Sequence, residues 1–219
     1  MKKIEVLNLR ELEAAAQKII PAGGFGYISS AAGDEWTKRE NEAAFKRVTI
    51  QTRCLTGNVD ADLTTTLLGA KLAMPVITSV MGGHGLAHVT AEVGTAKGTH
   101  AAGSLFTAPS QSTLTMEEIA QASPGPKWFQ IYMPEDRGKA REILQRAKAA
   151  GYLAVVLTVD AFVSSNRETD LRNRFRSPLP AGNFPGQPGG YGRNPVKRNL
   201  GWDDVAFIQQ VTEIGRAHV

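Results

Sequence analysis

Short apolar runs alternate with helical patterns through the middle of this 219-residue chain, and this alternation limits the possible folds more than any other feature. Four apolar runs predict strands at 75–77, 104–106, 128–132 and 154–157. Apolar residues at helical spacing lie between them, in 89–101, 116–122 and 137–150. Near-continuous apolar strands separated by helices predict a parallel sheet with helices packed on it. Such a sheet is either doubly wound or closed into a (β/α)8 barrel.

Polar residues at the ends of three predicted strands favour the barrel. They are Thr78 and Ser79 after the first run, Gln130 and Tyr132 in the third, and Thr158 and Asp160 after the fourth. In a barrel the active site lies at the C-terminal ends of the strands, so side chains from several strands meet there. Gln130 and Tyr132 are two residues apart and therefore share one face of their strand. A dinucleotide-binding G-x-G-x-x-G and a phosphate-binding G-x-x-x-x-G-K-[ST] are both absent from the sequence.

Helix starts are marked by a capping residue followed three positions later by a carboxylate. This pattern predicts three starts, at Asn8 with Glu11, Thr37 with Glu40 and Thr115 with Glu118. Pro21 ends the first helix, and another helix begins near Trp202. Between them, residues 177–199 hold five Pro and five Gly, which predicts a lid or a disordered loop.

Composition excludes several classes of protein. The chain is long enough for one sizeable core, and 42% of its residues are hydrophobic. It has no apolar run near the 18 residues that a membrane helix needs. The start, MKKIEVLNLR, lacks the apolar region of a secretory signal, so a cytoplasmic protein without a membrane partner is expected. The basic residues behind the net charge of +4 are dispersed along the chain and interleaved with Asp and Glu, rather than gathered on one patch. This distribution argues against a nucleic-acid partner. The single Cys54 cannot form an internal disulfide.

Some candidate residues leave two interpretations open. His84 and His88 are four apart, as in a metal site on a helix, but no Glu follows His84 as in H-E-x-x-H and no third ligand is evident, so no metal is expected. Gly23, Gly24 and Gly26 either approach a ligand closely or end the first helix. Arg167 is either a solvated surface charge or a planar donor for a carboxylate. No motif of a covalent hydrolase is present.

Several longer motifs together resemble one family. They are GFGYISSAAGDEWTKREN (24–41), HGLAH (84–88), KWFQIYM (127–133), LTVDAFVSSNRETDLRNRF (157–175) and WDDVAFI (202–208). In combination they resemble the FMN-dependent 2-hydroxy-acid oxidases and dehydrogenases, especially lactate-oxidase-like members, over about residues 5 to 212. The resemblance implies a (β/α)8 barrel that holds FMN at the C-terminal ends of its strands. It also implies oxidation of a small L-2-hydroxy acid to the 2-oxo acid by a homo-oligomeric parent enzyme.

The resemblance also implies roles for individual residues. Tyr27 and Tyr132 match tyrosines that contact the substrate carboxylate and hydroxyl, and Arg167 matches an arginine at the substrate mouth. The positions that match flavin contacts are Val80, Met81, Gly82, Pro109, Gln130 and Thr158. This chain departs from the family pattern in three places: Ser79-Val80-Met81-Gly82 replaces a segment that usually begins Ala-Pro, Pro109 replaces a serine, and Gln111 replaces an aromatic residue. The sequence therefore does not predict which 2-hydroxy acid is used.

Catalytic residues of the family have no match here. The resemblance implies a histidine base, a second arginine, a lysine and the phosphate-binding loops, and all of them lie beyond the end of this chain. We therefore expect residues 1–212 to be the N-terminal part of a single incomplete (β/α)8 barrel, and residues 213–219 to be an artefactual tail. As written, the chain is expected neither to hold FMN tightly nor to turn over. The alternative is a non-catalytic half-barrel that acts by self-association through its open sheet edges.

Overall fold

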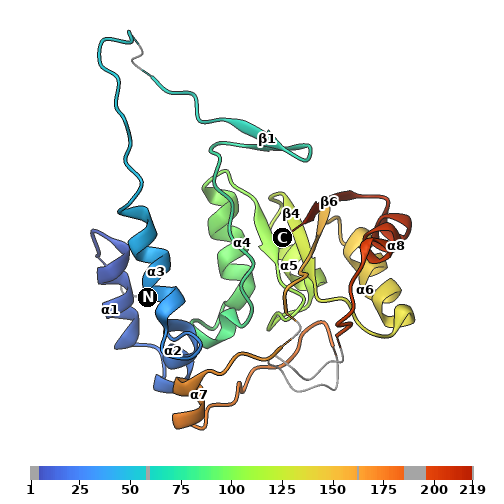
Figure 1. Ribbon diagram of the computed structural model, residues 1–219. Helices are drawn as coiled ribbons and strands as arrows, with labels where there is room; N and C mark the ends of the chain where they lie inside the picture. The colour runs from blue at the N-terminus through green and yellow to red at the C-terminus, as the bar shows by residue number, and fades with distance from the viewer. Residues whose placement is uncertain (1–4, 58–59, 162, 185–195, 219) are drawn as a thin grey trace. The chain divides into compact units, whose positions relative to one another are not determined.

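The computed structural model describes residues 5–57, 60–161, 163–184 and 196–218. They divide into two compact units. Unit 1 comprises Met1–Asp62 and Ser165–Arg176, and unit 2 comprises Leu63–Ser164 and Ser177–Val219. Figure 1 labels the helices and strands of both units.

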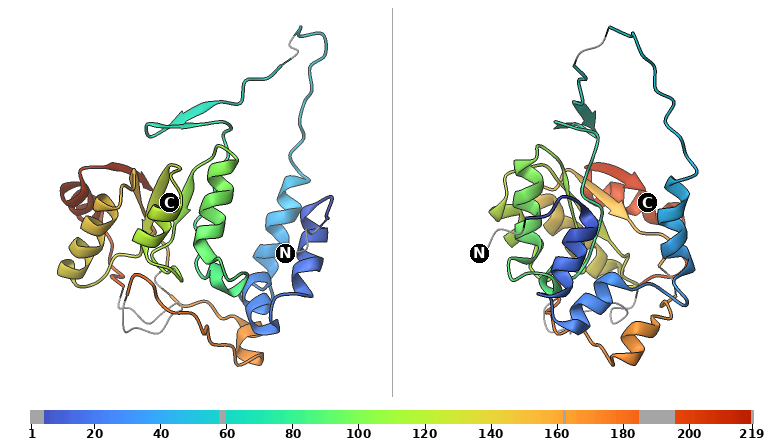
Figure 2. Two further views of the ribbon diagram at one scale, coloured as in Figure 1. Left: turned by 180° about the vertical axis from the view of Figure 1, so that it is seen from behind. Right: turned by 90° about the vertical axis from the view of Figure 1, so that its left-hand side faces the viewer.

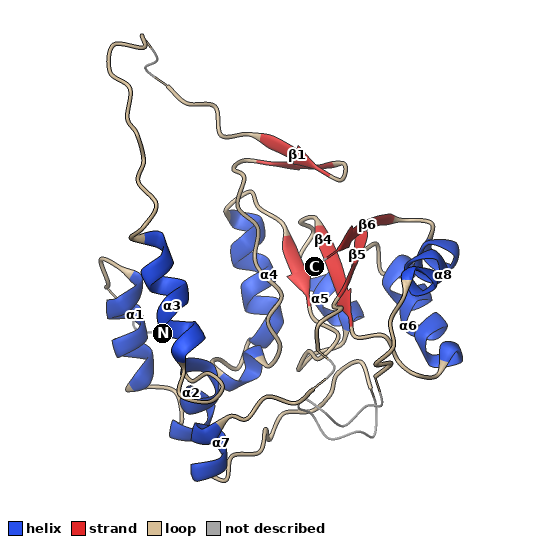
Figure 3. Cartoon of the chain, in the orientation of Figure 1, coloured by secondary structure: helices blue, strands red, loops and turns tan. Residues whose placement is uncertain are grey.

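Unit 1 is helical, with α1 at Leu9–Gln17, α2 at Ala22–Ser29, α3 at Trp36–Phe45 and α7 at Glu168–Arg172. Unit 2 holds the strands and the remaining helices. Its strands are β1 (Thr65–Leu67), β2 (Ala70–Leu72), β3 (Phe106–Ala108), β4 (Lys127–Ile131), β5 (Ala154–Leu157) and β6 (Gly215–His218). Its helices are the 3₁₀ turn η1 (His84–Leu86), α4 (Ala91–Ala101), α5 (Met116–Ala122), α6 (Arg137–Ala149) and α8 (Trp202–Thr212). Figure 3 shows the same elements coloured as helix, strand and loop.

Helix starts were predicted with mixed success. Asn8 accepts a hydrogen bond from the Glu11 N–H at 3.0 Å, and Thr115 with Glu118 forms a complete capping box on α5, so both starts are confirmed. Thr37 as a cap was wrong, because α3 begins one residue earlier and Glu35 precedes it in the left-handed region, at φ 63°. Gly23, Gly24 and Gly26 do not end the first helix, because they lie inside α2.

The sheet of unit 2 has the strand order β3-β4-β5-β6, and every neighbouring pair is parallel. The strand predicted at 154–157 is β5, and those predicted at 128–132 and 104–106 are displaced by one and two residues. The strand predicted at 75–77 was wrong: Pro75 has no N–H to donate, and the segment forms no regular strand. It nevertheless runs beside β3, because Ala73 N–H donates to Gly103 O at 2.9 Å and Thr78 N–H to Leu105 O at 3.1 Å.

The last described strand, β6, falls in the stretch expected to be a foreign tail, and it pairs with β5 from Ala154↔Gly215 to Leu157↔His218. Only part of the predicted lid at 177–199 is described, since 185–195 lies outside the described residues. At its two ends Gly182 N–H donates to Ser112 O at 3.0 Å, and Val196 forms a β-bridge with Pro134.

The two faces of the sheet carry different side chains because residues alternate along each strand. Helices α4, α5, α6 and α8 pack on one face, and Figure 2 shows α6 and α8 beside each other there. The strand residues buried beneath these helices are Phe106, Ala108, Phe129, Ile131, Val155 and Leu157. We call the opposite side the inner face. There the β1–β2 hairpin contributes Ala70 and Leu72 to a second cluster, with Leu105, Trp128, Ala154 and Val156.

Candidate functional site

The inner face becomes polar toward the C-terminal ends of β4 and β5. Gln130 is fully buried there, and its Nε2 donates to Thr158 Oγ1 at 2.9 Å. Its Oε1 accepts two hydrogen bonds from Ser110, from the backbone N–H at 3.1 Å and from the hydroxyl at 3.3 Å. The pairing of β4 with β5 places these side chains together, because Thr158 N–H continues the ladder by donating to Ile131 O at 3.2 Å. The sequence prediction that Gln130 and Thr158 are neighbours is therefore confirmed.

Beside β3, the segment after Pro75 contributes a second set of polar contacts. The Thr78 hydroxyl donates to Leu105 O at 3.2 Å and accepts from the Thr107 N–H at 3.4 Å. Val80 packs against the inner-face cluster, while Met81 is exposed. A Cβ on Gly82 would lie 3.1 Å from Gln111 O, so glycine allows the two backbones to approach closely. The segment 80–82 thus runs close to the loop after β3, in which Pro109 is buried.

Tyr132 is half-buried and follows Ile131 directly. By strand alternation it lies on the same side as Gln130, at the edge where Thr158 begins the loop after β5. The structure therefore places Tyr132, Gln130 and Thr158 at one end of one sheet, as the sequence predicted. Asp160, the other polar residue that follows β5, is exposed.

Tyr27 and Arg167 come together in unit 1. The Arg167 guanidinium lies over the Tyr27 ring, 4.5 Å from its centroid, and donates to the Tyr27 carbonyl. It also pairs with Asp170, with Nε 2.7 Å from Oδ2, and donates to the Ser30 carbonyl at 3.3 Å. Arg167 is therefore not a solvated surface charge. It joins α7 to the end of α2, and its stacking on Tyr27 is a contact that lysine would not reproduce in the same geometry.

His84 and His88 do not form a metal site. His84 Nδ1 lies 2.8 Å from Thr95 Oγ1, and His88 Nδ1 lies 2.8 Å from Thr90 Oγ1, so each ring turns to its own threonine. The two histidines also do not share a regular helix, because η1 includes only His84. Across the described ranges, no group of three or more His, Cys, Asp or Glu could hold a metal ion.

Sequence reasoning missed three buried polar residues that surround the candidate site. Ser110 binds Gln130, and Asn183 donates to both Ser110 and Ser112. Glu92 accepts from the backbone N–H groups of His84, Thr113 and Leu114, which organises the loop after β3. The sequence offers little signal for any of them, because their partners are between 8 and 73 residues away along the chain.

One ionisable group in the sheet is excluded from the site by its position. Lys127 is buried at the first residue of β4, the end opposite Tyr132, and burial lowers the pKa of its amine. Its Nζ donates to the carbonyls of Ser123 at 2.5 Å and Gly125 at 2.6 Å, so it joins the loop before β4 to the strand. We assign it a structural role.

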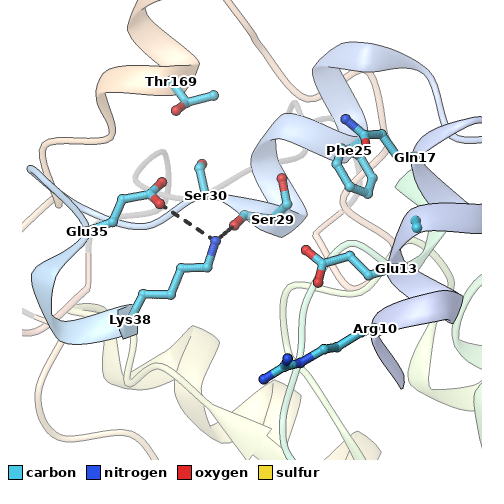
Figure 4. Close-up of a pocket in the computed structure, with 10 residues that line it drawn as sticks. Arg10, Glu13, Gln17, Phe25, Ser29, Ser30, Glu35, Lys38 and Thr169 are labelled. Carbon is cyan, nitrogen blue, oxygen red and sulfur yellow. Dashed lines mark hydrogen bonds and ion pairs between the residues drawn. The ribbon is translucent and has the colours of Figure 1, made fainter. Parts of the chain in front are cut away.

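A separate pocket of about 400 Å³ lies within unit 1 (Figure 4). Charged side chains line it, including Arg10, Glu13, Glu35 and Lys38. Figure 4 shows Lys38 Nζ directed at Ser29 and Glu35, and the Lys38–Glu35 ion pair measures 3.6 Å. Neither Tyr27 nor Arg167 lines the pocket, but Ser30, which accepts a hydrogen bond from Arg167, does.

Comparison with known proteins identifies the family. The model of the family described as FMN-dependent dehydrogenase matches residues 16–214. The chain belongs to the FMN-dependent dehydrogenase family. It is 40% identical to the L-lactate oxidase of Lentilactobacillus hilgardii over 97% of this chain, and 36% identical to the glycolate oxidase of Spinacia oleracea over 96%. The chain spans only 60% and 61% of the length of these two relatives.

Solved structures of the family agree with this assignment. A Pediococcus acidilactici protein described as a lactate oxidase matches 99% of this chain with a TM-score of 0.93 and 37% identity, and 60% of that protein is covered. A mandelate oxidase matches 98% of this chain with a TM-score of 0.89 and 27% identity, and 62% of it is covered. The expected fold class, an incomplete (β/α)8 barrel, is confirmed: these oxidases match nearly the whole chain, only 60% to 62% of their length is covered, and the described strands of the parallel sheet do not close. No helix in the described part of the chain could cross a membrane.

FMN dependence of the family agrees with the cofactor expected from the sequence. The chemistry of the inner face also suits a flavin, whose ring has carbonyl oxygens and nitrogens along one polar edge. Gln130 keeps a second N–H beyond the one that it gives to Thr158, and the Thr158 hydroxyl that accepts this bond has a hydrogen of its own to donate. Both groups are held in place by other hydrogen bonds, as a site that orients a cofactor requires.

Proposed function

We propose that this chain supplies the flavin-facing side of an FMN-dependent oxidoreductase that converts a lactate-like L-2-hydroxy acid to the 2-oxo acid. The observation that carries the proposal is the hydrogen bond from the buried Gln130 to the half-buried Thr158 at the C-terminal end of a parallel sheet, in a chain of the FMN-dependent dehydrogenase family. Active sites of (β/α)8 barrels lie at this end of the strands. The proposal includes a cytoplasmic, homo-oligomeric enzyme without a nucleic-acid partner, for which the sequence composition and the family resemblance are the support.

Contacts to the cofactor are proposed for six residues: Val80, Met81, Gly82, Pro109, Gln130 and Thr158. Bound FMN would accept the hydride that leaves the α-carbon of the substrate. The protein's part is to orient the ring. Gln130 and Thr158 would present hydrogen-bond donors from fixed positions, while the 80–82 segment would place backbone groups against the ring because Gly82 lets it run close to Gln111.

Contacts to the substrate are proposed for Tyr27, Tyr132 and Arg167. An anionic carboxylate needs a cation and hydroxyl donors, which these three residue types provide. Arg167 pairs with Asp170 and stacks on Tyr27, so we propose that it acts both as a positive charge near the substrate and as the group that orients Tyr27. Exchanging Arg167 for lysine would keep the charge but lose the planar stacking surface.

Assays of the parent enzyme, of which this chain is expected to be the N-terminal part, test the proposed activity; we call this parent enzyme the complete gene product. L-lactate, glycolate and mandelate are compared as substrates with an artificial electron acceptor, and the absorption spectrum of the purified protein reports bound flavin. We expect a yellow protein that reduces the acceptor with at least one of these acids, with L-lactate preferred. A purified protein that contains no flavin and cannot be reconstituted with FMN would contradict the proposal.

Replacing Gln130 is expected to weaken FMN binding. In Gln130→Leu, the donor to the flavin edge is lost and the Ser110 N–H loses its acceptor. We expect FMN to bind roughly 10- to 100-fold more weakly, which corresponds to the loss of one or two hydrogen bonds. Fluorescence titration of the complete gene product measures the Kd. Gln121→Leu is the matched control, because Gln121 is exposed on α5, and equal Kd values for the two variants would remove Gln130 from the flavin site.

A further inference from the structure

Asn183 connects three segments through one buried side chain. It is 2% exposed, and its Nδ2 donates to Ser110 O at 3.1 Å and to Ser112 Oγ at 2.8 Å. Its Oδ1 accepts from the Met116 N–H, the first residue of α5, at 2.9 Å. A single carboxamide thus satisfies groups of the loop after β3 and of the helix that follows this loop. Buried amides whose donors and acceptor are all used hold their surroundings in one arrangement.

A continuous chain of hydrogen bonds leads from Asn183 to the polar end of the inner face. Asn183 holds the Ser110 carbonyl, the Ser110 N–H donates to Gln130 Oε1 at 3.1 Å, and Gln130 Nε2 donates to Thr158 at 2.9 Å. Because an N–H can only donate, the Ser110 N–H selects the oxygen of the Gln130 amide. The NH₂ group of Gln130 is therefore directed to Thr158. A flipped amide would place two donors against each other.

The backbone around Asn183 is closely fitted to the same loop. Gly182 N–H donates to Ser112 O at 3.0 Å, and a Cβ on Gly182 would lie 2.3 Å from the Leu114 carbonyl carbon. No side chain fits at that distance, so glycine is required for the contact. The Asn183 carbonyl in turn accepts from Arg146 at 3.3 Å. The backbone is thus held both before and after the Asn183 side chain.

From these contacts we propose that Asn183 is a positioning residue, which fixes the orientation of the Gln130 amide by holding Ser110. This inference rests on the proposed function for its significance, because the amide that Asn183 orients is the one proposed to face FMN. The competing role is purely structural, in which Asn183 only caps α5 through Met116. The two roles are separable because they use different atoms: Nδ2 faces Ser110, and Oδ1 faces Met116.

Variants at position 183 separate these roles. Asn183→Asp keeps an acceptor for the Met116 N–H and removes both donors, whereas Asn183→Ala removes all three bonds. Tyr152→Phe is the matched control: the buried Tyr152 hydroxyl donates to Met116 O at 2.9 Å, so its loss loosens the start of α5 without touching Ser110. The exposed Gln121→Ala controls for the removal of a carboxamide as such.

Amide hydrogen exchange and side-chain NMR of the FMN-free chain give a readout that does not depend on activity. We expect both variants at position 183 to speed exchange of the Ser110 N–H by about 5- to 10-fold, the effect of releasing one hydrogen-bonded group, and to shift the Gln130 side-chain NH₂ signals. Tyr152→Phe should change Ser110 exchange by less than about twofold. Should Asn183→Ala fail to fold, Asn183→Asp carries the same comparison.

The proposal is overturned if the position-183 variants match Tyr152→Phe at Ser110 and at the Gln130 NH₂ signals, because Asn183 would then only cap α5. FMN titration of the complete gene product keeps this result separate from the proposed function. Altered Ser110 exchange in a protein that does not bind FMN would support the positioning role and contradict the flavin site. Unaltered exchange in a protein that binds FMN would contradict the positioning role alone.

Discussion

Asp204→Ala is expected to lower the free energy of unfolding by about 2 to 4 kcal/mol, from the loss of a helix cap and of hydrogen bonds between a buried carboxylate and two partly exposed cations. Asp204 is fully buried in the first turn of α8, where it accepts from the Gly201 N–H at 2.8 Å. It also binds Lys197, with Nζ 2.9 Å from each carboxylate oxygen, and Arg137 of α6. The substitution therefore removes the cap of α8 and leaves two cations without their shared partner.

Urea unfolding of Asp204→Ala and Asp203→Ala measures this difference. Asp203 lies in the same turn of α8 but is exposed, so its replacement is expected to change stability by less than about 0.5 kcal/mol. Asp204→Asn retains the acceptor for the Gly201 N–H and should lose less than the alanine variant. Equal unfolding midpoints for the variants at 203 and 204 would show that the Asp204 cluster contributes nothing.

The same carboxylate should make stability depend on pH. Burial acts to raise the pKa of Asp204, but the hydrogen bonds from Lys197 and Gly201 and the charge of Arg137 outweigh it, so the pKa lies below the ordinary value of 3.8. A lowered folded-state pKa stabilises the protein above the unfolded-state value, and this stabilisation is lost as the pH falls through the folded-state value. The free energy of unfolding of the unsubstituted chain should therefore decrease as the pH falls below about 4. In Asp204→Asn this free energy should depend less on pH in the same range. If the stability of the unsubstituted chain and that of Asp204→Asn depend on pH in the same way, Asp204 is not the group responsible.

Gly182→Ala is the second substitution with a large expected effect, a loss of about 3 kcal/mol or more from overpacking against a rigid neighbour. The added Cβ would lie 2.3 Å from the Leu114 carbonyl carbon and 2.4 Å from its oxygen, and backbone atoms cannot move aside as a flexible side chain can. The 181–184 loop would have to shift. This movement would also displace Asn183 from Ser110.

Gly98→Ala is the control for this substitution, with the opposite expected sign. Gly98 is exposed inside α4, and a Cβ there meets nothing within 4 Å. Alanine should raise stability by roughly 0.5 to 1 kcal/mol, because it restricts the unfolded chain and favours the helix. Thermal unfolding of both variants checks the pair. A Gly182→Ala protein as stable as the parent would show that the two loops are not in the close contact described.

Local signals in the sequence predicted the regular parts of unit 2. The β5 strand was predicted at its observed bounds, since a continuous apolar run that ends at the polar Thr158 suits a strand buried on both faces. The capping box of α5 was also correct, because Thr115 and Glu118 interact within one turn. One error overlooked a local signal, and another arose where a tertiary neighbour decides the conformation. Pro75 cannot join the ladder, and Gly23 lies inside α2, where a Cβ would be 2.6 Å from the Phe175 ring.

The candidate site, too, was predicted in part from the sequence and decided in part by the tertiary structure. Period-two alternation and the succession of strands and helices were enough, from the sequence alone, to predict a parallel α/β fold with Gln130 and Thr158 together at one end of the sheet. Only the tertiary structure decided their partners. Asn183 reaches Ser110 across 73 positions, and Arg167 reaches Tyr27 across 140. Alternation along a strand is set by each residue's own backbone, whereas a buried polar group takes whichever partner the packed core brings within hydrogen-bond distance.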